Sequence, residues 1–328
     1  MTHSTLLLVN FGGPRSQEEI SPFLQELLCD TDVIRNKLPL RLHRFLFRQI
    51  ARKRAKKIAH DYALIGGGSP IFFDTEFLKE ELAKSLNTKV ISFHRYLPST
   101  HKESIEEIEN SSASEIKVLP LFPQFTFATS GSIARFFSEN LSQSTQKKLR
   151  WIPSYGNHPT FISLFQEKIR TFLQNQNLKE EEVFLLFSAH GLPQAFIDTG
   201  DSYQKECEES FRLILEGFPK SPGKLSFQSK FGRAAWIEPY TEVIANNITQ
   251  WSQGRKHIVF IPLSFTSDHI ETLFEIEELY LPLVRKQNIE AYRCPAFNRD
   301  ANWIQTLTLL SQDKTIAEKE NHELLFQR

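Results

Sequence analysis

Short apolar runs alternate with longer amphipathic stretches along almost the whole chain, and turn-forming residues separate them. Apolar runs of this kind are typical of buried parallel strands, and amphipathic stretches between them are typical of connecting helices. The pattern therefore predicts an α/β fold. The predicted strands span residues 5–11, 89–93, 116–122, 150–154, 183–188, 224–228, 257–263 and 290–293. The predicted helices span residues 16–28, 75–86, 102–110, 132–141, 159–173, 203–217, 240–253, 271–286 and 300–312.

The two halves of this pattern resemble each other. Residues 7–14 and 186–193 both read as an apolar strand, a short polar stretch and Gly-x-Pro, and two further strand pairs follow in the same order. This repetition predicts two pseudo-repeated Rossmann-like lobes, each with its own parallel sheet. The expected divisions are an N-terminal lobe over 1–150 with an inserted segment at about 30–70, a C-terminal lobe over 151–312, and a polar tail over 313–328.

Composition narrows the class of protein. Lys plus Arg and Asp plus Glu both number 39, so the net charge is zero and the overall basic character of a nucleic-acid-binding protein is missing. Three widely spaced cysteines exclude a disulfide framework and a compact cysteine-based zinc or iron–sulfur motif. No signal peptide is recognisable, and no apolar run approaches the roughly 20 residues of a membrane span. These features together predict a cytoplasmic protein.

The most informative segment is Ser188–Pro193, which reads Ser-Ala-His-Gly-Leu-Pro. It follows the apolar run 183–187 directly, and its glycine and proline break the predicted strand. His190 is therefore expected at the carboxyl end of a buried strand, where open α/β sheets bind their ligands. A neutral imidazole there can accept a proton near neutral pH or bind a metal ion. A buried structural histidine is the alternative that this segment alone leaves open.

A second cluster follows a later strand at the same predicted sheet edge. Asp268, His269 and Glu271 open a predicted helix with an acidic face. Glu271, Glu275 and Glu278 stand at i, i+4 and i+7, so an α-helix would place them on one face. Like charges at that spacing repel each other by roughly 0.2–0.5 kcal/mol, which favours a role with protons or cations. A solvated acidic face near a helix N-terminus is the alternative.

A third segment, 224–241, runs from a predicted strand into a loop that holds Lys230, Arg233 and Trp236. Cations beside an aromatic ring suit a flat, anionic and apolar ligand better than a small polar one. An irregular surface loop would explain the two cations but not the tryptophan. By contrast, the glycine-rich segment 65–70 lacks both the dinucleotide and the P-loop signature, which favours a tight turn over a phosphate site.

The segment Arg35–Lys57 carries ten basic residues and no acidic residue. Leucine, phenylalanine and isoleucine residues are interleaved with these cations, which makes the segment amphipathic. Such a segment fits a helix lying on an anionic membrane surface. It fits equally a solvated basic helix that packs by its apolar side. Aromatic platforms outside the segment do not cluster with it, so a nucleic-acid role is not expected.

Seven motifs, taken together and in order, make the chain resemble the ferrochelatase family, of bacterial type. Members of this family insert ferrous iron into a porphyrin. The resemblance extends from Leu6 to about Trp303, and although each motif is weak alone, the combination is specific. The motifs are Asn10–Pro14, Ile65–Pro70, Arg95-Tyr96, Leu121–Phe125, Ser188–Pro193, Phe227–Arg233 and Ser267–Leu273.

The resemblance implies two lobes of the chelatase type with the active-site cleft between them. It also implies a lyase of haem and porphyrin biosynthesis that inserts Fe²⁺ into protoporphyrin IX, releases two protons and forms protohaem. Iron is then a substrate, and neither a nicotinamide, ATP nor an iron–sulfur cluster is expected as a cofactor. Residues 227–241 are more similar to the protohaem-forming bacterial branch than to the branch that uses coproporphyrin.

Several alternatives stay open beside this interpretation. They are a coproporphyrin III ferrochelatase, a non-catalytic porphyrin or haem carrier, and a membrane-surface scaffold that uses only Arg35–Lys57. Sirohydrochlorin and cobalt chelatases share the fold, but a richer histidine set would be expected of them.

By motif match, the resemblance assigns the catalytic role to His190 and Glu271, which are also expected to bind the metal. A path for protons or metal is expected along Asp268, His269, Glu275 and Glu278. The residues expected to bind porphyrin are Arg95, Tyr96, Lys230, Arg233 and Trp236. The expected partners are thus porphyrin and ferrous iron, without nucleic acid. A peripheral contact with the inner face of the membrane is expected through Arg35–Lys57.

Overall fold

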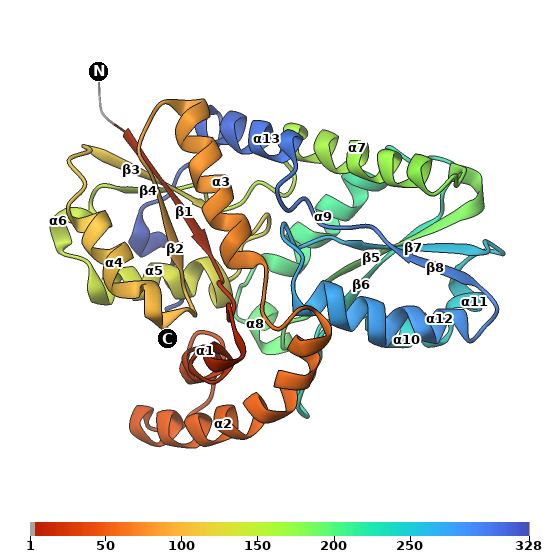
Figure 1. Ribbon diagram of the computed structural model, residues 1–328, viewed down its shortest axis with the longest axis horizontal. Coiled ribbons are helices and arrows are strands. Elements are labelled where there is room, and N and C mark those ends of the chain that lie inside the picture. Colours follow the sequence, from red (N-terminus) through yellow and green to blue (C-terminus); the bar gives the residue numbers. More distant parts are fainter. Residues whose placement is uncertain (1–3, 328) are drawn as a thin grey trace. The chain divides into compact units, whose positions relative to one another are not determined.

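The computed structural model describes residues 4–327 and contains two four-stranded sheets whose neighbouring strands are all parallel. The strand orders are β2-β1-β3-β4 and β6-β5-β7-β8, so the second sheet repeats the topology of the first (Figure 1). This repetition confirms the predicted α/β class with two pseudo-repeated lobes. The strands are β1 (Ser4–Asn10), β2 (Val90–His94), β3 (Glu115–Pro120), β4 (Leu149–Trp151), β5 (Val183–His190), β6 (Gly223–Gln228), β7 (His257–Pro262) and β8 (Glu290–Arg293).

Each predicted helix is found, with two internal differences, and the short helices over 143–146 and 194–198 were not predicted. Asn247 divides the helix predicted over 240–253, and the helix predicted over 271–286 begins as a π-helix. The α-helices are α1 (Gln17–Cys29), α2 (Leu40–Leu64), α3 (Ile71–Leu86), α4 (Pro98–Glu109), α5 (Ser132–Asn140), α6 (Gln143–Gln146), α7 (Pro159–Asn175), α8 (Gln194–Asp198), α9 (Tyr203–Leu215), α10 (Thr241–Asn246), α11 (Ile248–Trp251), α12 (Leu281–Arg285) and α13 (Ala301–Gln312). The π-helices are η1 (Phe127–Gly131) and η3 (Ile270–Tyr280), and the 3₁₀-helices are η2 (Glu180–Glu182) and η4 (Asn321–Leu324).

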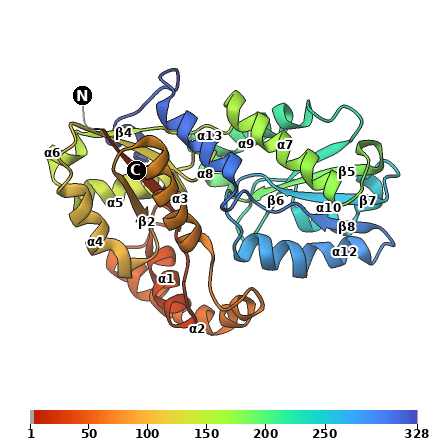
Figure 2. The ribbon, with the colours of Figure 1, turned by 45° about the horizontal axis from the view of Figure 1, so that its top comes forward.

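The first compact unit comprises the described residues up to Ser154 together with those from Arg299 onward. Its central strand β1 is buried from Leu6 to Val9 because helices cover both faces of the sheet. On one face, Leu7 and Val9 share a core with apolar residues of α4 and α5. α3 packs against β1 and β2, and α13 lies beside α3 (Figures 1 and 2). The helix pair α1 and α2 follows the carboxyl end of β1.

The second unit, Tyr155–Asn298, repeats this arrangement around β5. One face of its sheet packs against α10, α11, η3 and α12, which share a core with Phe184 and Leu186 of β5. α7 and α9 lie side by side on the opposite face (Figure 1). Because β5 is buried along its length, its first solvent-accessible side chain comes where the strand ends, at His190.

The end of the chain belongs to the first unit, whereas the sequence analysis assigned 151–312 to the second lobe and 313–328 to a polar tail. α13 belongs there because its apolar stripe is buried and because Arg299 Nε donates to Asp74 Oδ1 of α3 at 2.7 Å. The residues after α13 are anchored too. Trp151 Nε1 donates to Asn321 Oδ1 at 3.0 Å, and Leu324 lies in the core beside α5.

The glycine-rich segment 65–70 forms a tight turn between α2 and α3, as predicted. Gly66 and Gly67 have φ values of 99° and 89°, which strongly favour glycine. A Cβ on Gly68 would lie 2.5 Å from the carbonyl oxygen of Arg15, so this position also requires glycine. The glycines are therefore explained by the backbone conformation of this turn and by its close approach to Arg15, without a phosphate site.

Candidate functional site

His190 and Glu271 form a hydrogen-bonded pair at the carboxyl edge of the second sheet. β5 extends two residues beyond the predicted end, so that His190 is its last residue and pairs in register with Gln228 of β6. Glu271 lies in the first turn of η3, and its Oε2 is 2.8 Å from Nδ1 of His190. The two side chains are 36% and 21% exposed, so the pair is accessible from solvent.

The surroundings of this pair raise the pKa of His190 and lower the pKa of Glu271. Burial disfavours a charged imidazole, but the Glu271 carboxylate outweighs that effect and raises the pKa of His190 above its ordinary value. Burial likewise opposes a charged Glu271, yet His190 and His269 hold its pKa well below the ordinary value. Glu271 is therefore a carboxylate at neutral pH, and His190 is a stronger base than a free histidine.

Glu275 behaves differently from Glu271 although it lies only one turn further on. Its Oε2 accepts hydrogen bonds from Ser229 Oγ at 2.6 Å and from Gln228 Nε2 at 3.0 Å. Burial, followed by the nearby Glu271 carboxylate, raises the pKa of Glu275 to about 7. Glu275 can therefore take up or release a proton close to neutral pH.

Glu278 does not join the pair, because η3 is a π-helix. Its i→i+5 hydrogen bonds widen each turn, so a spacing of seven residues no longer returns to the same face. Glu278 is exposed, whereas Glu271 and Glu275 are partly buried. The predicted three-residue acidic row is thus reduced to two members. π-helical turns of this kind occur frequently at functional sites.

The two residues before η3 differ in their surroundings. His269 Nε2 lies 3.7 Å from Glu271 Oε2, so His269 borders the pair. Asp268 is instead held by Arg293, whose Nη1 donates to its Oδ1 at 2.7 Å, and by Asn298, whose Nδ2 donates to its Oδ2 at 2.8 Å. Asp268 therefore ties the start of η3 to the segment after β8, and its side chain is nearly buried.

Trp236 covers one side of His190. The two rings meet edge to face with centroids 6.5 Å apart, and Phe231 packs against the tryptophan with centroids 5.2 Å apart. This approach requires glycine at position 191, because a Cβ there would lie 3.1 Å from the Trp236 ring and 2.7 Å from the Gln228 carbonyl oxygen. An aromatic surface therefore adjoins the imidazole.

The two cations of the same loop differ in their surroundings. Lys230 Nζ lies 4.0 Å from the ring centroid of Tyr240, which is the geometry of a cation–π contact. Arg233 is exposed to solvent.

Arg95 and Tyr96 belong to a buried network in the first unit. Arg95 Nη2 and the Tyr96 hydroxyl both donate to Asp30 Oδ2, at 2.7 and 3.0 Å, and Ser132 also donates to this oxygen. Arg95 Nη1 has no hydrogen-bond partner among residues 4–327, and Glu26 Oε2 lies 3.9 Å from it. Asp30 and Ser132 were missed by the sequence analysis, since no motif marked them.

α2 is packed on one side only. Its narrow buried stripe consists of His43, Ala51, Ala55 and Tyr62, and it packs on α1. The outward side leaves Leu42, Phe45 and Leu46 exposed by 50%, 64% and 42% of their surfaces. A shallow hollow on this side is lined by Arg41, Arg44, Phe45, Arg48, Gln49 and Arg52. Much of the apolar surface of the segment is therefore uncovered, unlike in a helix that packs by its whole apolar side.

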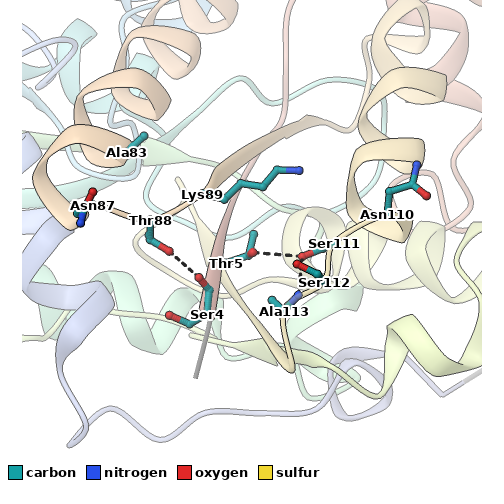
Figure 3. Close-up of a pocket in the computed structure, with 10 residues that line it drawn as sticks. All are labelled: Ser4, Thr5, Ala83, Asn87, Thr88, Lys89, Asn110, Ser111, Ser112 and Ala113. Carbon is teal, nitrogen blue, oxygen red and sulfur yellow. Dashed lines mark hydrogen bonds between the residues drawn. The ribbon is translucent and has the colours of Figure 1, made fainter. Parts of the chain in front are cut away.

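Another hollow, of about 460 Å³, lies at the opposite, amino-terminal edge of the first sheet (Figure 3). Hydrogen bonds between Thr88 and Ser4 and between Thr5 and Ser111 link the segments that line it. Parallel α/β sheets bind their ligands at the carboxyl ends of the strands, so this hollow is not a candidate active site.

Residues 4–327 contain no cluster of three or more His, Cys, Asp and Glu side chains arranged to hold a metal ion. None of the described helices combines the length and the apolar character needed to cross a lipid bilayer.

Comparison with protein families places this geometry in context. The family model described as "Ferrochelatase" matches residues 3–315. Among curated relatives, ferrochelatase of Chlamydia trachomatis serovar A is 45% identical over 306 residues, which cover 93% of this chain and 94% of the relative. Ferrochelatase of Chlamydia caviae is 42% identical over 318 residues, covering 97% and 98% of the two chains.

Solved structures support the fold. SirB from Bacillus subtilis with Fe³⁺ superimposes with a TM-score of 0.51 at 15% identity, covering 99% of both chains. CbiX, the terminal enzyme for sirohaem biosynthesis in denitrifying bacteria, gives a TM-score of 0.50 at 11% identity, covering 95% of this chain and 100% of that one. At these identities the similarity establishes a chelatase-like fold.

Proposed function

Because the chain belongs to the ferrochelatase family, it inserts iron into a porphyrin for haem biosynthesis, and we propose that His190 and Glu271 carry this reaction. The single observation that supports this assignment most strongly is the 2.8 Å contact between His190 Nδ1 and Glu271 Oε2 at the carboxyl edge of the second sheet.

The reaction requires a base that faces the porphyrin. Fe²⁺ replaces two pyrrole protons, so a neutral porphyrin and Fe²⁺ yield neutral haem and two protons. His190 presents its second ring nitrogen away from Glu271 and can accept these protons one at a time. Glu271, held as a carboxylate, stabilises the imidazolium that forms. The raised pKa of His190 increases its strength as a base.

Protons or hydrated iron then need a route, and we assign it to the start of η3. His269 borders Glu271, and Glu275 has a pKa of about 7, so both suit a chain of proton transfers. Asp268 supports this segment through Arg293. Glu278, exposed on another face of η3, is left out of the route. Two or three such ligands hold iron only transiently, which suits a metal that is passed on to the porphyrin.

The aromatic surface beside His190 supports porphyrin as the organic substrate. Phe231, which is exposed and packs on the buried Trp236, can cover the face of the macrocycle, while Lys230 and Arg233 can neutralise propionates from the same loop. Arg95 is a further candidate for a propionate through the family resemblance alone, because its guanidinium is buried and pairs with Asp30, to which Tyr96 also donates. Protoporphyrin IX is the proposed porphyrin because residues 227–241 resemble the protohaem-forming branch.

Anaerobic Fe²⁺ insertion, followed by absorbance, tests this proposal with protoporphyrin IX and coproporphyrin III offered separately. We expect turnover of protoporphyrin IX. Turnover of coproporphyrin III alone would support iron insertion but would contradict protoporphyrin IX as the substrate. Tight binding of porphyrin without turnover of either would indicate a carrier.

We further propose that α2 contacts an anionic membrane surface from the cytoplasmic side. Leu42, Phe45 and Leu46 would enter the headgroup region, and the flanking arginines would pair with lipid phosphates. Clustered basic residues near an anionic leaflet contribute roughly 1 kcal/mol each. This charge complementarity favours a lipid surface over a second protein.

Replacing Arg41, Arg44 and Arg48 together by glutamine is expected to weaken binding to phosphatidylglycerol vesicles by about 100-fold, since three charges are removed. Flotation of the full chain with vesicles measures this effect. The matched control replaces the exposed lysines Lys84, Lys102 and Lys220, which changes the net charge equally and should leave flotation intact. Equal losses in both variants, or no loss in either, would contradict a specific role for α2.

A further inference from the structure

Gln228 is a buried residue beside the His190–Glu271 pair that links the end of β6 to η3. It is the last residue of β6, it is only 2% exposed, and it stands opposite His190 in the parallel ladder. Its Nε2 donates to the backbone carbonyl of Glu271 at 2.8 Å and to Glu275 Oε2 at 3.0 Å. One amide group therefore contacts two successive acidic residues of η3.

The orientation of this amide follows from its partners. Both groups that face Nε2, a backbone carbonyl and a side-chain carboxyl oxygen, are acceptors, so the NH₂ group must point toward η3. The opposite end, Oε1, accepts a hydrogen bond from Ser188 Oγ at 2.7 Å. Because a glutamine amide has two donor hydrogens, both are used on η3.

The neighbouring hydroxyl groups hold this orientation. Ser188 Oγ lies 2.9 Å from Thr241 Oγ1, which lies 2.9 Å from Ser226 Oγ. Ser226 Oγ donates to the Phe187 carbonyl, and all three hydroxyl-bearing residues are fully buried. Buried networks of this kind rigidify a site when every member is satisfied. Rotation of the amide would leave Ser188 without its acceptor and place an oxygen against two oxygens.

The backbone next to Gln228 adds to the constraint. Ser229 has a φ of 65°, a left-handed conformation that is uncommon outside glycine. This conformation accompanies the contact of its hydroxyl with Glu275 Oε2 at 2.6 Å, so Gln228 at the end of β6 and the residue after it both hold Glu275. Strained residues of this type concentrate at functional sites.

We propose that Gln228 is a positioning residue that fixes the first turn of η3 against the sheet, so that the Glu271 carboxylate reaches Nδ1 of His190. This inference rests on the proposed function of the pair. Gln228 acts on the reaction through Glu271 and Glu275. Without its amide, the start of η3 keeps its covalent connections but loses the only side-chain contact described between β6 and the Glu271 backbone.

The test replaces Gln228 by leucine, which has a similar size and cannot form hydrogen bonds. We expect kcat for Fe²⁺ insertion to fall at least 10-fold, while KM for porphyrin changes less than 2-fold. The control is Gln166→Leu in α7, because Gln166 also donates to two backbone carbonyls, those of Leu213 and Ile214. The control should keep wild-type kcat, and thermal melts of both variants report on folding.

A second variant, Gln228→Glu, separates positioning from general packing. It preserves shape and the acceptor for Ser188, but a carboxylate would face the two acceptors of η3. Only the protonated form of this carboxyl group can donate a hydrogen bond. The rate of Fe²⁺ insertion, relative to wild type, should therefore rise several-fold as the pH falls from 8 to 6. Thermal melts at both pH values check that Gln228→Glu stays folded, because a buried carboxylate also destabilises the fold as pH rises. A rate change in the folded variant reports on positioning.

The proposal is overturned if Gln228→Leu folds and retains kcat within 2-fold, or if Gln166→Leu loses as much. If Gln228→Leu does not fold, the test rests on Gln228→Glu. A ratio of its insertion rate to the wild-type rate that stays constant between pH 8 and pH 6 then overturns the proposal. Failure of the proposed function itself would appear differently, as an absence of wild-type turnover in the same assay.

Discussion

Replacement of His190 by alanine is expected to lower kcat for Fe²⁺ insertion by roughly 10²–10⁴-fold, the range typical of a lost general base. The side chain is the only group of β5 that reaches the sheet edge beside Glu271, so no neighbour in that strand can take over its proton. Porphyrin affinity should change little, because the exposed Phe231, packed on Trp236, remains. Single-turnover absorbance for the chemical step and fluorescence quenching for porphyrin binding measure the two effects separately.

His257 offers a matched control for this experiment. It lies at the start of β7, away from the carboxyl edge of the same sheet, and its Nδ1 contacts the Tyr292 hydroxyl at 3.2 Å. His257→Ala should retain wild-type turnover. Retention of more than a tenth of kcat in His190→Ala would contradict the assignment of His190 as the base.

Replacement of Asp30 by alanine is expected to destabilise the chain by about 3–5 kcal/mol, the usual cost of breaking a buried ion pair from one side. Asp30 accepts hydrogen bonds from Arg95, Tyr96 and Ser132, and its side chain is 4% exposed. Its removal leaves the Arg95 charge buried without its carboxylate. Urea unfolding monitored by fluorescence measures the loss.

Glu26 provides the control for Asp30. Its carboxylate is 44% exposed and lies 3.9 Å from Nη1 of the same arginine, so Glu26→Ala should cost less than about 1 kcal/mol. The double variant Asp30→Ala with Arg95→Leu should recover part of the stability, because it removes the uncompensated charge. A loss below about 1 kcal/mol in Asp30→Ala would show that the network does not stabilise the fold.

The location of the His190–Glu271 pair could be predicted because its signals are local. An apolar run followed by Gly-x-Pro is enough to place His190 at the end of a strand, and the order of elements is enough to place Glu271 after a strand of the same sheet. Local pattern also predicted every strand of both sheets, since burial on both faces demands continuous apolar runs.

Other features depended on contacts between distant segments. The partners of Arg95 and Tyr96 come from positions 30 and 132, and hydrogen bonds over such separations leave no periodic trace in the sequence. The same holds for α13, whose apolar stripe indicated a helix but not which unit would bury it.

The sequence by itself determined the α/β class, the repeated strand order, the ferrochelatase family and the places of His190 at the end of a strand and Glu271 at the start of a helix. Only the tertiary structure decided that η3 widens into a π-helix, which keeps Glu275 near the pair and turns Glu278 to solvent. It also decided that Gln228 donates to Glu271 and Glu275. The physical reason is that the hydrophobic pattern specifies which residues are buried, whereas hydrogen-bond partners are selected by the packing of whole elements.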